Sequence, residues 1–468
     1  MTADPLVDTF VRLLGDGGVL TSPEDRARFE KGWRYGVGAA RCVVRPASTQ
    51  EVAAVLRLCN EQRVRVVPQG ANTGLVAAST PDASGTMVVL SLERLNRRIE
   101  VDVHGRTVVV DGGVLLSQLN ERLAKDGFWF PVDLGADPQI GGMVATNTGG
   151  TRLLRYGDVR HNLLGLEVVL GDGRVLTQLN RLRKNNTGLD AKHLFVGTTG
   201  VFGVVTHAVL QIAPLPQQRA VALVACHDGD TVLELLTALE AELGEVLSAF
   251  EVMSAQALEA VFAHQANLRR PFAKLPRYAA LVELSSTLPV TTLSLEAALQ
   301  ARLEWFVEQA GDGVPDVLIG NGDEFWQLRH HISESLRSAG KMLAFDISVP
   351  RSMLPAFTGE VERLLAADWP AVRLCDYGHW GDGGTHLNLV WSEAEVGKPL
   401  AEVTAALQPR IYELAVHGYG GSYSAEHGVG PHNQRYFDLY TDPLVKRLGG
   451  LLADFCDPAG LLGTVRLR

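Results

Sequence analysis

The 468-residue sequence predicts a multi-domain α+β protein, and three of its features lead to that prediction. Hydrophobic residues make up 46% of the chain and charged residues 21%, so it can form more than one core and is too apolar to be disordered. Short β-type runs bounded by glycine dominate residues 43–215, with helical stretches at 50–60 and 114–125. After Pro214-Leu215-Pro216, strand-like runs alternate with longer helical ones, as expected for a second sheet covered by helices.

The predicted elements divide the chain near residue 215. The first part contains β-type runs at 64–67, 87–90, 107–110, 166–170 and 204–206. The second part contains strand-like runs at 219–225, 247–253, 278–285 and 342–349, and helical runs at 229–242, 290–310 and 351–367. We therefore predict domains at 1–215 and 216–410, followed by a C-terminal segment, 411–468, that packs back on the first domain.

Charge, cysteine content and the N-terminus restrict the class of protein. The net charge of -10, with dispersed Arg and Lys, argues against nucleic acid as a partner but leaves room for a small anionic substrate. The start, Met1-Thr2-Ala3-Asp4-Pro5, carries an acid where a secretory signal needs basic residues, and no apolar run approaches the roughly 20 residues of a membrane span. The five cysteines form no CxxC pair and are expected to be buried apolar residues, so we predict a cytoplasmic protein.

Three glycine-rich loops in the first part are candidate anion-binding elements. They span residues 69–75, 141–150 and 197–203. Each can present successive backbone N–H groups beside small side chains, which lets a phosphate approach closely. Any one of them could be an ordinary turn. Because neither GxxxxGK[ST] nor GxGxxG after a first strand occurs, the three together point to a large cofactor gripped mainly by backbone.

A histidine-rich region in the second half carries the candidate chemistry. Asp382-Gly383-Gly384 predicts a tight turn, and in a strand after it His386 and Asn388 share a face, to which the turn can return His379. Further on, Glu426-His427 lies in a glycine-flanked loop. Two histidines and a carboxylate match the ligands of a catalytic zinc or similar divalent ion. Taken singly, each histidine could be a core residue and Glu426-His427 a surface pair.

The glycine-rich half resembles the FAD domain of the vanillyl-alcohol oxidase / p-cresol methylhydroxylase fold. The resemblance is carried by Pro68 to Leu75, Ile140 to Asn147, Arg155-Tyr156-Gly157, Asn162 to Gly165 and Lys192 to Gly197. It implies that the first two loops wrap the FAD pyrophosphate and that residues 200–204 pass near the adenine and flavin. Since no histidine lies within 69–75, where covalent members attach their flavin, non-covalent FAD is implied. The implied cofactor-binding residues are Gln69, Gly70, Ala71, Asn72, Thr73, Gly74, Leu75, Gly141, Gly142, Thr146, Asn147, Gly149, Gly150, Gly200, Val201, Gly203 and Val204.

The second half resembles FAD-linked D-2-hydroxy-acid dehydrogenases, a group that includes D-2-hydroxyglutarate and D-lactate dehydrogenases. The resemblance implies metal ligands, zinc above all, at His379, His386 and Glu426, and a catalytic base at His427. It implies substrate contacts at Asn388, Arg329 and Ser333, the last two of which are four apart in a helical segment and share a face. The first domain is then the FAD-binding domain, 216–410 the substrate domain, and 411–468 the segment that supplies Glu426 and His427.

The implied reaction is oxidation of a D-2-hydroxy acid to the 2-oxo acid, with hydride transfer to flavin N5. The substrate class is D-2-hydroxyglutarate, D-lactate or D-malate. Ala344 stands where 2-hydroxyglutarate enzymes place a lysine for the distal carboxylate, which favours a different or shorter tail. The implied partners are an electron acceptor (electron-transfer flavoprotein, quinone or cytochrome) and a second copy of the chain in a homodimer.

Three other functions stay open at this point. One is an enzyme of the same fold with other chemistry, such as a phenolic-alcohol oxidase or an ether-lipid synthase, which would not need the His379/His386/Glu426 site. The second is a flavin subunit of a glycolate oxidase-like electron-transfer complex. The third is a metal-dependent hydrolase without flavin.

Overall fold

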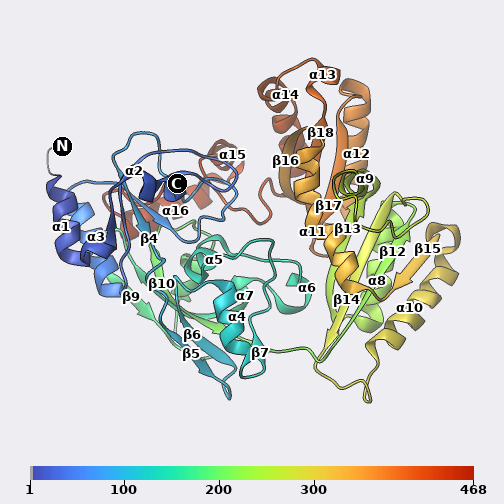
Figure 1. The fold of residues 1–468 in the computed structure, drawn as a ribbon, viewed down its shortest axis with the longest axis horizontal. Helices are drawn as coiled ribbons and strands as arrows, with labels where there is room; N and C mark the ends of the chain where they lie inside the picture. The colour runs from blue at the N-terminus through green and yellow to red at the C-terminus, as the bar shows by residue number, and fades with distance from the viewer. Residues whose placement is uncertain (1–3) are drawn as a thin grey trace. The chain divides into compact units, whose positions relative to one another are not determined.

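The computed structural model describes residues 4–468, and the chain divides into two compact units that alternate along the sequence (Figure 1). Unit 1 comprises the chain up to Gly149, then Gly157–Leu215 and Glu426–Arg468. Unit 2 comprises Gly150–Tyr156 and Pro216–Ala425. The main boundary falls at residue 215, where the sequence pattern changes.

The described strands of unit 1 form a four-stranded sheet in the order β1-β2-β4-β3, a five-stranded sheet in the order β5-β6-β10-β8-β9, and the β11-β7 pair. The strands are β1 (Val19–Leu20), β2 (Ala40–Val44), β3 (Val66–Gln69), β4 (Met87–Ser91), β5 (Ile99–Asp102), β6 (Thr107–Asp111), β7 (Phe128–Trp129), β8 (Leu163–Val169), β9 (Val175–Gln178), β10 (Val204–Gln211) and β11 (Ala213–Pro214). The helices are α1 (Pro5–Leu14), α2 (Pro23–Glu30), α3 (Thr49–Glu61), α4 (Leu116–Ala124), α5 (Ile140–Thr146), α7 (Val159–Asn162), α15 (Gln434–Tyr440) and α16 (Pro443–Cys456).

Helix α3 shows how the sequence fixes a crossover in the first sheet. Ser48 accepts a hydrogen bond from Glu51 N–H, which satisfies one of the free N–H groups of the first turn, and the Glu51 carboxylate accepts one from Ala47 N–H just before the cap. Its apolar face, Val52, Val55, Leu56 and Cys59, repeats at helical spacing and is buried against β2 and β4. The helix therefore links β2 to β3, which both run parallel to β4.

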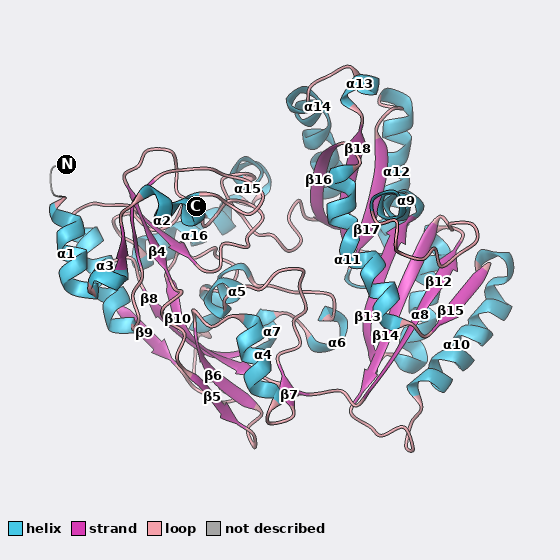
Figure 2. Cartoon of the chain, viewed as in Figure 1, coloured by secondary structure: helices cyan, strands magenta, loops and turns pink. Residues whose placement is uncertain are grey.

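Unit 2 is built on a seven-stranded sheet in the order β15-β12-β14-β13-β17-β18-β16, with every neighbouring pair antiparallel (Figure 2). The strands are β12 (Gln218–Cys226), β13 (Leu247–Ser254), β14 (Tyr278–Ser286), β15 (Asp316–Ile319), β16 (Lys341–Ser348), β17 (Arg373–Gly378) and β18 (Gly384–Trp391). The helices are α6 (Leu153–Tyr156), α8 (Gly229–Leu243), α9 (Ala255–His264), α10 (Leu295–Ala310), α11 (Gly322–Ser338), α12 (Leu354–Asp368), α13 (Glu393–Val396) and α14 (Leu400–Glu413).

One face of this sheet packs against α9 and α11, which bury Phe262, Trp326 and Ile332 on the strands. The helices α8, α10 and α12 pack together on the sheet from its other side, in contact with β12, β14 and β17. Both faces of the central strands are therefore covered. As a result β13 and β14 are buried along their whole lengths, including the acidic residues Glu251 and Glu283.

The domain limits differ from the prediction at two places. Residues 411–425 lie in unit 2, because α14 runs through 410 with Leu407, Ile411 and Tyr412 buried and the chain then bridges Ser422 to Ser348. The short segment 150–156 also lies in unit 2. Its Arg152 donates from Nε to the buried Glu283 carboxylate at 2.9 Å. A lone arginine in a loop gave no signal of this pairing.

The buried carboxylate of Glu283 is neutralised and hydrogen-bonded by several side chains. Besides Arg152, Arg219 forms an ion pair with its Oε2 at 2.5 Å, Trp326 Nε1–H donates to Oε2 at 3.0 Å, and Ser248 Oγ–H donates to Oε1 at 2.9 Å. Burial raises the pKa of Glu283, but the two arginines outweigh it and lower the pKa below the usual value. Without these partners, an ionised carboxylate in this strand would cost several kcal/mol.

All five cysteines are free and buried, in agreement with the prediction. Within residues 4–468, no helix combines the length and hydropathy that a membrane crossing needs.

A cross-strand charge triad stabilises the five-stranded sheet of unit 1. His207 on β10 lies opposite Asp111 on β6 and Glu167 on β8, with its Nε2 2.9 Å from Asp111 Oδ1 and its Nδ1 3.0 Å from Glu167 Oε1. Burial lowers the pKa of His207, but the two carboxylates outweigh burial and raise it. The pKa values of Asp111 and Glu167 are raised by burial and lowered more by these hydrogen bonds.

The triad predicts a defined pH window for the stability of unit 1. The contribution of His207 to the free energy of unfolding is complete below the pKa of the unfolded state and is lost as the pH rises through the raised pKa of the folded state. The contribution of Asp111 and Glu167 is instead lost as the pH falls through their lowered pKa values. We expect His207→Gln to lower the free energy of unfolding by roughly 1–3 kcal/mol at pH 6, and by less at pH 9. Thermal melts of both proteins across this range test it. An unchanged difference between pH 6 and pH 9 would contradict the triad's role.

Candidate functional site

The strand register of unit 2 gathers most of the predicted site residues on one sheet face. Tyr377 pairs with His386, Asp346 with His386, and Ala344 with Asn388, and residues directly opposite in a ladder point to the same side. This is the face that α11 covers, since Tyr377 packs in the same core as Trp326. The predicted strand with His386 and Asn388 on one face is therefore confirmed.

His379 and His386 meet across a tight hairpin turn. The chain leaves β17 at Gly378, turns through 379–383, and returns as β18. Gly383 has φ 92°, and a Cβ on it would lie 2.5 Å from the Val349 carbonyl oxygen, so only glycine fits there. The two imidazole rings are 5.3 Å apart between centroids and inclined at 74°. This spacing suits two ligands of one metal ion.

Glu251 fixes the orientation of His379. It lies on β13, one residue beyond the Val252–Gly378 pair, and its Oε1 is 2.5 Å from His379 Nδ1. Burial raises the pKa of Glu251, but the charges of His379 and Arg329 outweigh it and lower the pKa to about 2. Because the ionised carboxylate can only accept, Nδ1 carries the proton and Nε2 the lone pair that a metal ion needs. Sequence reasoning missed Glu251, although a single acid in Ala249-Phe250-Glu251-Val252-Met253 is a usable signal.

Arg329 lies on the buried side of α11 and its head group is held at two points. Its Nε donates to Glu251 Oε2 at 2.6 Å, and its guanidinium carbon is 4.7 Å from the centroid of the Tyr377 ring. Asn388 is buried on β18 and donates from Nδ2 to the His386 carbonyl at 2.8 Å. Ser333 lies one turn along α11 from Arg329, half-buried, and its Oγ is 3.5 Å from Arg337 Nη2.

The lysine nearest to Ala344 in the sequence, Lys341, is directed away from this face. Ala344 lies opposite Asn388 in the β16–β18 ladder, so its small side chain is on the site face. Lys341, three residues earlier, lies opposite Trp391 and forms an ion pair with Glu393 at 3.2 Å. The position next to Asn388 therefore offers no cation from β16.

The segment that leads to Glu426 is hydrogen-bonded to strand β16. Ala425 N–H donates to the Asp346 carbonyl at 3.2 Å, and Asp346 pairs with His386. Glu426 follows Ala425 directly and begins the last segment of unit 1.

The segment after His427 is tied to the glycine loops of unit 1. A Cβ on Gly428 would lie 3.5 Å from Thr199 Cγ2, and one on Gly430 would lie 2.0 Å from the Val76 carbonyl oxygen. Asn433 accepts from Gly430 N–H at 2.8 Å and donates to the Gly428 carbonyl at 2.9 Å. The loop that carries His427 therefore packs on the third glycine loop and on Val76, which follows the first.

Each of the three glycine-rich segments contains a non-glycine residue in the left-handed conformation. Asn72 has φ 57°, Asn147 φ 52° and Thr199 φ 53°. For a β-branched threonine this conformation is a genuine outlier and costs roughly 1–3 kcal/mol, a strain that concentrates at ligand sites. Thr199 N–H donates to the Ala145 carbonyl at 2.7 Å, so the second and third segments are joined.

The second segment is not a loop throughout, which corrects the prediction. Ile140–Thr146 forms α5, because Ile140, Met143 and Val144 recur at helical spacing and are buried. Gly141 lets this helix approach the strands, since a Cβ there would lie 2.9 Å from the Val205 carbonyl oxygen. Gly149 and Gly150 then lie on either side of the boundary between the units.

Unsatisfied polar atoms beside these segments fit a polar cofactor. Gln139 Oε1 and Thr199 Oγ1 are buried without a hydrogen-bond partner among the described residues. Gln139 Oε1 is 3.5 Å from the Cβ position of Gly70, whereas no described atom lies within 4 Å of the Cβ positions of Gly74 and Gly142. The backbone here borders open space, which a cofactor gripped by N–H groups requires.

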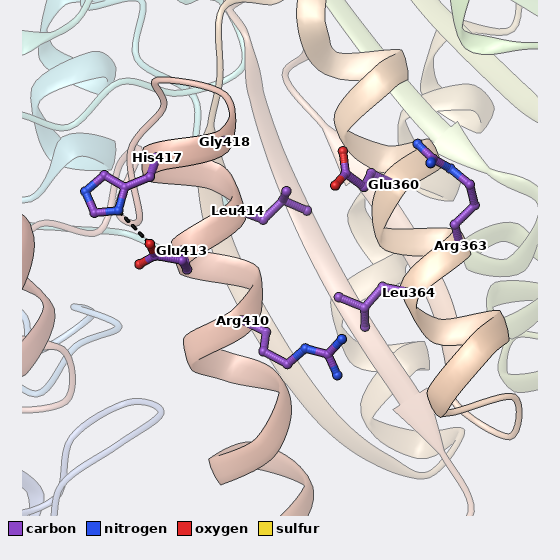
Figure 3. Close-up of a pocket in the computed structure, with 8 residues that line it drawn as sticks. All are labelled: Glu360, Arg363, Leu364, Arg410, Glu413, Leu414, His417 and Gly418. Carbon is purple, nitrogen blue, oxygen red and sulfur yellow. Dashed lines mark hydrogen bonds and ion pairs between the residues drawn. The ribbon is translucent and has the colours of Figure 1, made fainter.

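A groove between α12 and α14 of unit 2 contains none of the predicted site residues (Figure 3). Its charged groups pair locally: His417 Nδ1 is 2.8 Å from Glu413 Oε1, and Arg410 Nη1 is 2.8 Å from Asp368 Oδ2. The groove therefore presents no candidate catalytic site. The lining residues are Glu360, Arg363, Leu364, Arg410, Glu413, Leu414, His417 and Gly418.

Comparison with known proteins identifies the class. An FAD binding domain family matches residues 40–178, and the C-terminal domain of FAD linked oxidases matches residues 215–465. Among solved structures, p-cresol methylhydroxylase superposes with a TM-score of 0.71 at 17% identity, covering 97% of this chain and 94% of that one. The 4-ethylphenol oxidase of Gulosibacter chungangensis superposes with a TM-score of 0.72 at 17% identity, covering 98% and 95%. The fold prediction is confirmed, and the protein is an FAD-linked oxidoreductase.

Comparison with curated relatives identifies the family within this class. The mitochondrial D-2-hydroxyglutarate dehydrogenase of Bos taurus is 37% identical over 96% of this chain and 81% of its own length. That of Arabidopsis thaliana is 34% identical over 98% and 81%. The D-2-hydroxyglutarate–pyruvate transhydrogenase of Saccharomyces cerevisiae is 33% identical over 97% and 92%. The chain belongs to the FAD-linked D-2-hydroxy-acid dehydrogenase family.

Asp376 is a buried acid next to the site strands, on the opposite sheet face. Its Oδ2 has no hydrogen-bond partner among the described residues, and burial, with Glu362 nearby, raises its pKa to about 7. The folded protein thus keeps a proton that the unfolded chain releases near the usual 3.8. Stability from this group is therefore complete below pH 4 and is lost as the pH rises through 7.

We expect Asp376→Asn to raise the free energy of unfolding at pH 8 by roughly 2–4 kcal/mol, because the amide cannot ionise, and by less than half as much at pH 5, where the folded protein still holds the proton. Denaturant titrations of both proteins at the two pH values test this. Equal stability at pH 8 would show that Asp376 ionises without penalty.

Proposed function

We propose that the protein oxidises a D-2-hydroxy acid to the 2-oxo acid with non-covalently held FAD and a divalent cation, zinc above all. The observation that carries the proposal is the His379–His386 pair, with His379 held by Glu251 and the guanidinium of Arg329 bound to the same carboxylate. A pair of metal-ligand histidines beside a fixed guanidinium fits a substrate that carries a carboxylate and an adjacent hydroxyl.

The roles of the side chains follow from their chemistry. His379, His386 and Glu426 would ligate the cation, which, when bound, lowers the pKa of a ligated hydroxyl. Arg329 would bind the substrate carboxylate by charge-assisted hydrogen bonds, with Asn388 and Ser333 as further polar contacts. His427 would accept the hydroxyl proton at an imidazole nitrogen. FAD, when bound, supplies the acceptor for the hydride that leaves the substrate carbon, so one proton and one hydride leave together.

The proposed cofactor contacts are the backbone groups of the three glycine-rich segments. Gly74 and Gly142 border open space, and Thr199 and Gln139 offer unsatisfied oxygens there. The other functions named above are less well supported. A phenolic oxidase has no use for the His379/His386 pair, and a hydrolase without flavin has no use for the strained loops. The physiological electron acceptor, a homodimer and a cytoplasmic location stay predictions.

We expect D-2-hydroxy acids, and not their L-enantiomers, to bleach the flavin absorbance of the purified protein. Prolonged chelation should slow bleaching at least 100-fold, and added Zn²⁺ should restore it, because the cation lowers the hydroxyl pKa. His427→Ala should slow it by roughly 10²–10⁴ without loss of bound zinc. Anaerobic stopped-flow spectra test all three effects.

Two results would contradict the proposal: no D-2-hydroxy acid reduces the flavin, or His427→Ala leaves reduction unchanged. If the flavin is reduced but an artificial acceptor gives no turnover with the purified chain, the glycolate oxidase-like subunit becomes the better assignment.

We expect the substrate tail to differ from that of D-2-hydroxyglutarate, because Ala344 lies opposite Asn388 and Lys341 is paired with Glu393. D-Lactate or D-malate should then give the higher kcat/KM. Ala344→Lys should raise kcat/KM for D-2-hydroxyglutarate by about tenfold or more relative to D-lactate, since a new cation meets its distal carboxylate. Ala344→Met controls for bulk. A wild-type preference for D-2-hydroxyglutarate would refute this assignment.

A further inference from the structure

Glu251 is the only acid among the eight residues of β13, and its neighbours Phe250 and Val252 are fully buried. The Glu251 side chain is 1% exposed. An ionised carboxylate in such a place is expensive and persists only where its charge and lone pairs are matched. Both of its oxygens are engaged, and each of them contacts a different residue of the proposed site.

The two oxygens of Glu251 divide their contacts. Oε1 accepts from Nδ1 of His379 at 2.5 Å, and Oε2 accepts from Nε of Arg329 at 2.6 Å. Both bonds are charge-assisted, because the acceptor is an ionised carboxylate. One carboxylate thus joins the hairpin that carries His379 to the helix that carries Arg329.

For His379, this contact selects both the tautomer and the ring orientation. A histidine that ligates a metal through Nε2 commonly donates its Nδ1–H to a carboxylate, which makes the ligand nitrogen more basic and stops the ring from rotating. Trp380, which follows His379 in the turn, is fully buried.

For Arg329, Glu251 occupies the Nε edge while Tyr377 lies against the guanidinium, 4.7 Å from its carbon to the ring centroid. An arginine side chain has several rotatable bonds and loses entropy when it binds. Holding one edge and one face orders the group before a substrate arrives, so less entropy is lost on binding.

We propose that Glu251 is a positioning residue of this enzyme, which sets the cation affinity through His379 and the alignment of the substrate carboxylate through Arg329. The proposal rests on the proposed function, because it gives His379 and Arg329 their roles. Glutamine cannot replace glutamate here, since its amide nitrogen would face either His379 Nδ1–H or Arg329 Nε–H, donor against donor. Aspartate keeps the charge but is one methylene too short to reach both partners.

Glu283 on the neighbouring strand β14 is a matched control. It too is fully buried and paired with arginines, Arg152 and Arg219, but its partners include no histidine and no residue of the proposed site. Removing its charge perturbs the same sheet in the same way. A metal effect specific to Glu251 is thereby separated from a general loss of sheet stability.

The test compares the Zn²⁺ affinity of the wild-type chain with that of three variants, Glu251→Gln, Glu251→Asp and Glu283→Gln. Each is studied as the flavin-loaded full chain, is first stripped of metal by chelation, and is then titrated with Zn²⁺ in competition with a chromophoric chelator. We expect Glu251→Gln to weaken Zn²⁺ binding 10- to 100-fold and Glu251→Asp to weaken it less. Glu283→Gln should lower the melting temperature but leave Zn²⁺ binding within twofold. At saturating Zn²⁺, Glu251→Gln should still raise KM for the hydroxy acid at least fivefold, through Arg329.

The outcomes separate the two proposals. If the wild-type chain binds Zn²⁺ and oxidises a D-2-hydroxy acid while Glu251→Gln binds Zn²⁺ within twofold of wild type, the role of Glu251 is refuted and the proposed function stands. If Glu283→Gln weakens binding as much as Glu251→Gln does, the effect is structural and the role is again refuted. If the wild-type chain binds no Zn²⁺, both fail together. Should Glu251→Gln not fold, Glu251→Asp, with intermediate affinity expected, decides the matter alone.

Discussion

Charge compensation inside the unit 2 sheet is the constraint on which the rest of that unit depends. Glu251 and Glu283 lie on adjacent strands, fully buried, and neither can be ionised there without cationic partners. Helix α11 contributes one hydrogen-bond donor to each, the Arg329 guanidinium to Glu251 and, one turn earlier, the neutral Trp326 indole to Glu283. These two contacts fix the position of α11 on the sheet to within a hydrogen-bond length.

The same constraint explains why distant pieces of sequence belong to unit 2. Arg152 comes from the middle of the FAD-domain sequence, yet its charge is required beside Glu283. His379 comes from a hairpin more than a hundred residues after Glu251, and its ring is held by that carboxylate. Structural stability and the geometry of the candidate site therefore meet at Glu251, which contacts His379 and Arg329, whereas the contacts of Glu283 serve stability alone.

In unit 1, unusual backbone conformations lie in the glycine-rich segments. Asn72, Asn147 and Thr199 adopt left-handed backbone conformations, one in each glycine-rich segment. Side-chain and backbone hydrogen bonds maintain them: Asn72 Nδ2 donates to the Lys31 carbonyl at 2.8 Å, and Asn147 Nδ2 donates to Asp158 at 2.8 Å. Such conformations persist only where the surroundings over-determine them.

By itself the sequence determined the α+β class, the division near residue 215, many of the longer strands and helices, and the strand on which His386 and Asn388 share a face. It did not predict the strands β1, β5, β7, β9, β11, β15 and β17. The predicted features are local, because a period of two or of 3.6 residues is visible within a few positions. Motif resemblance added the FAD family, which the matched domains confirm. Tertiary structure alone decided that residues 150–156 and 411–425 belong to unit 2, that the second glycine segment is a helix, and that Glu251 joins His379 to Arg329. These depend on pairing between residues far apart in the chain, and a buried charge in a sequence shows that it needs a partner without showing which one.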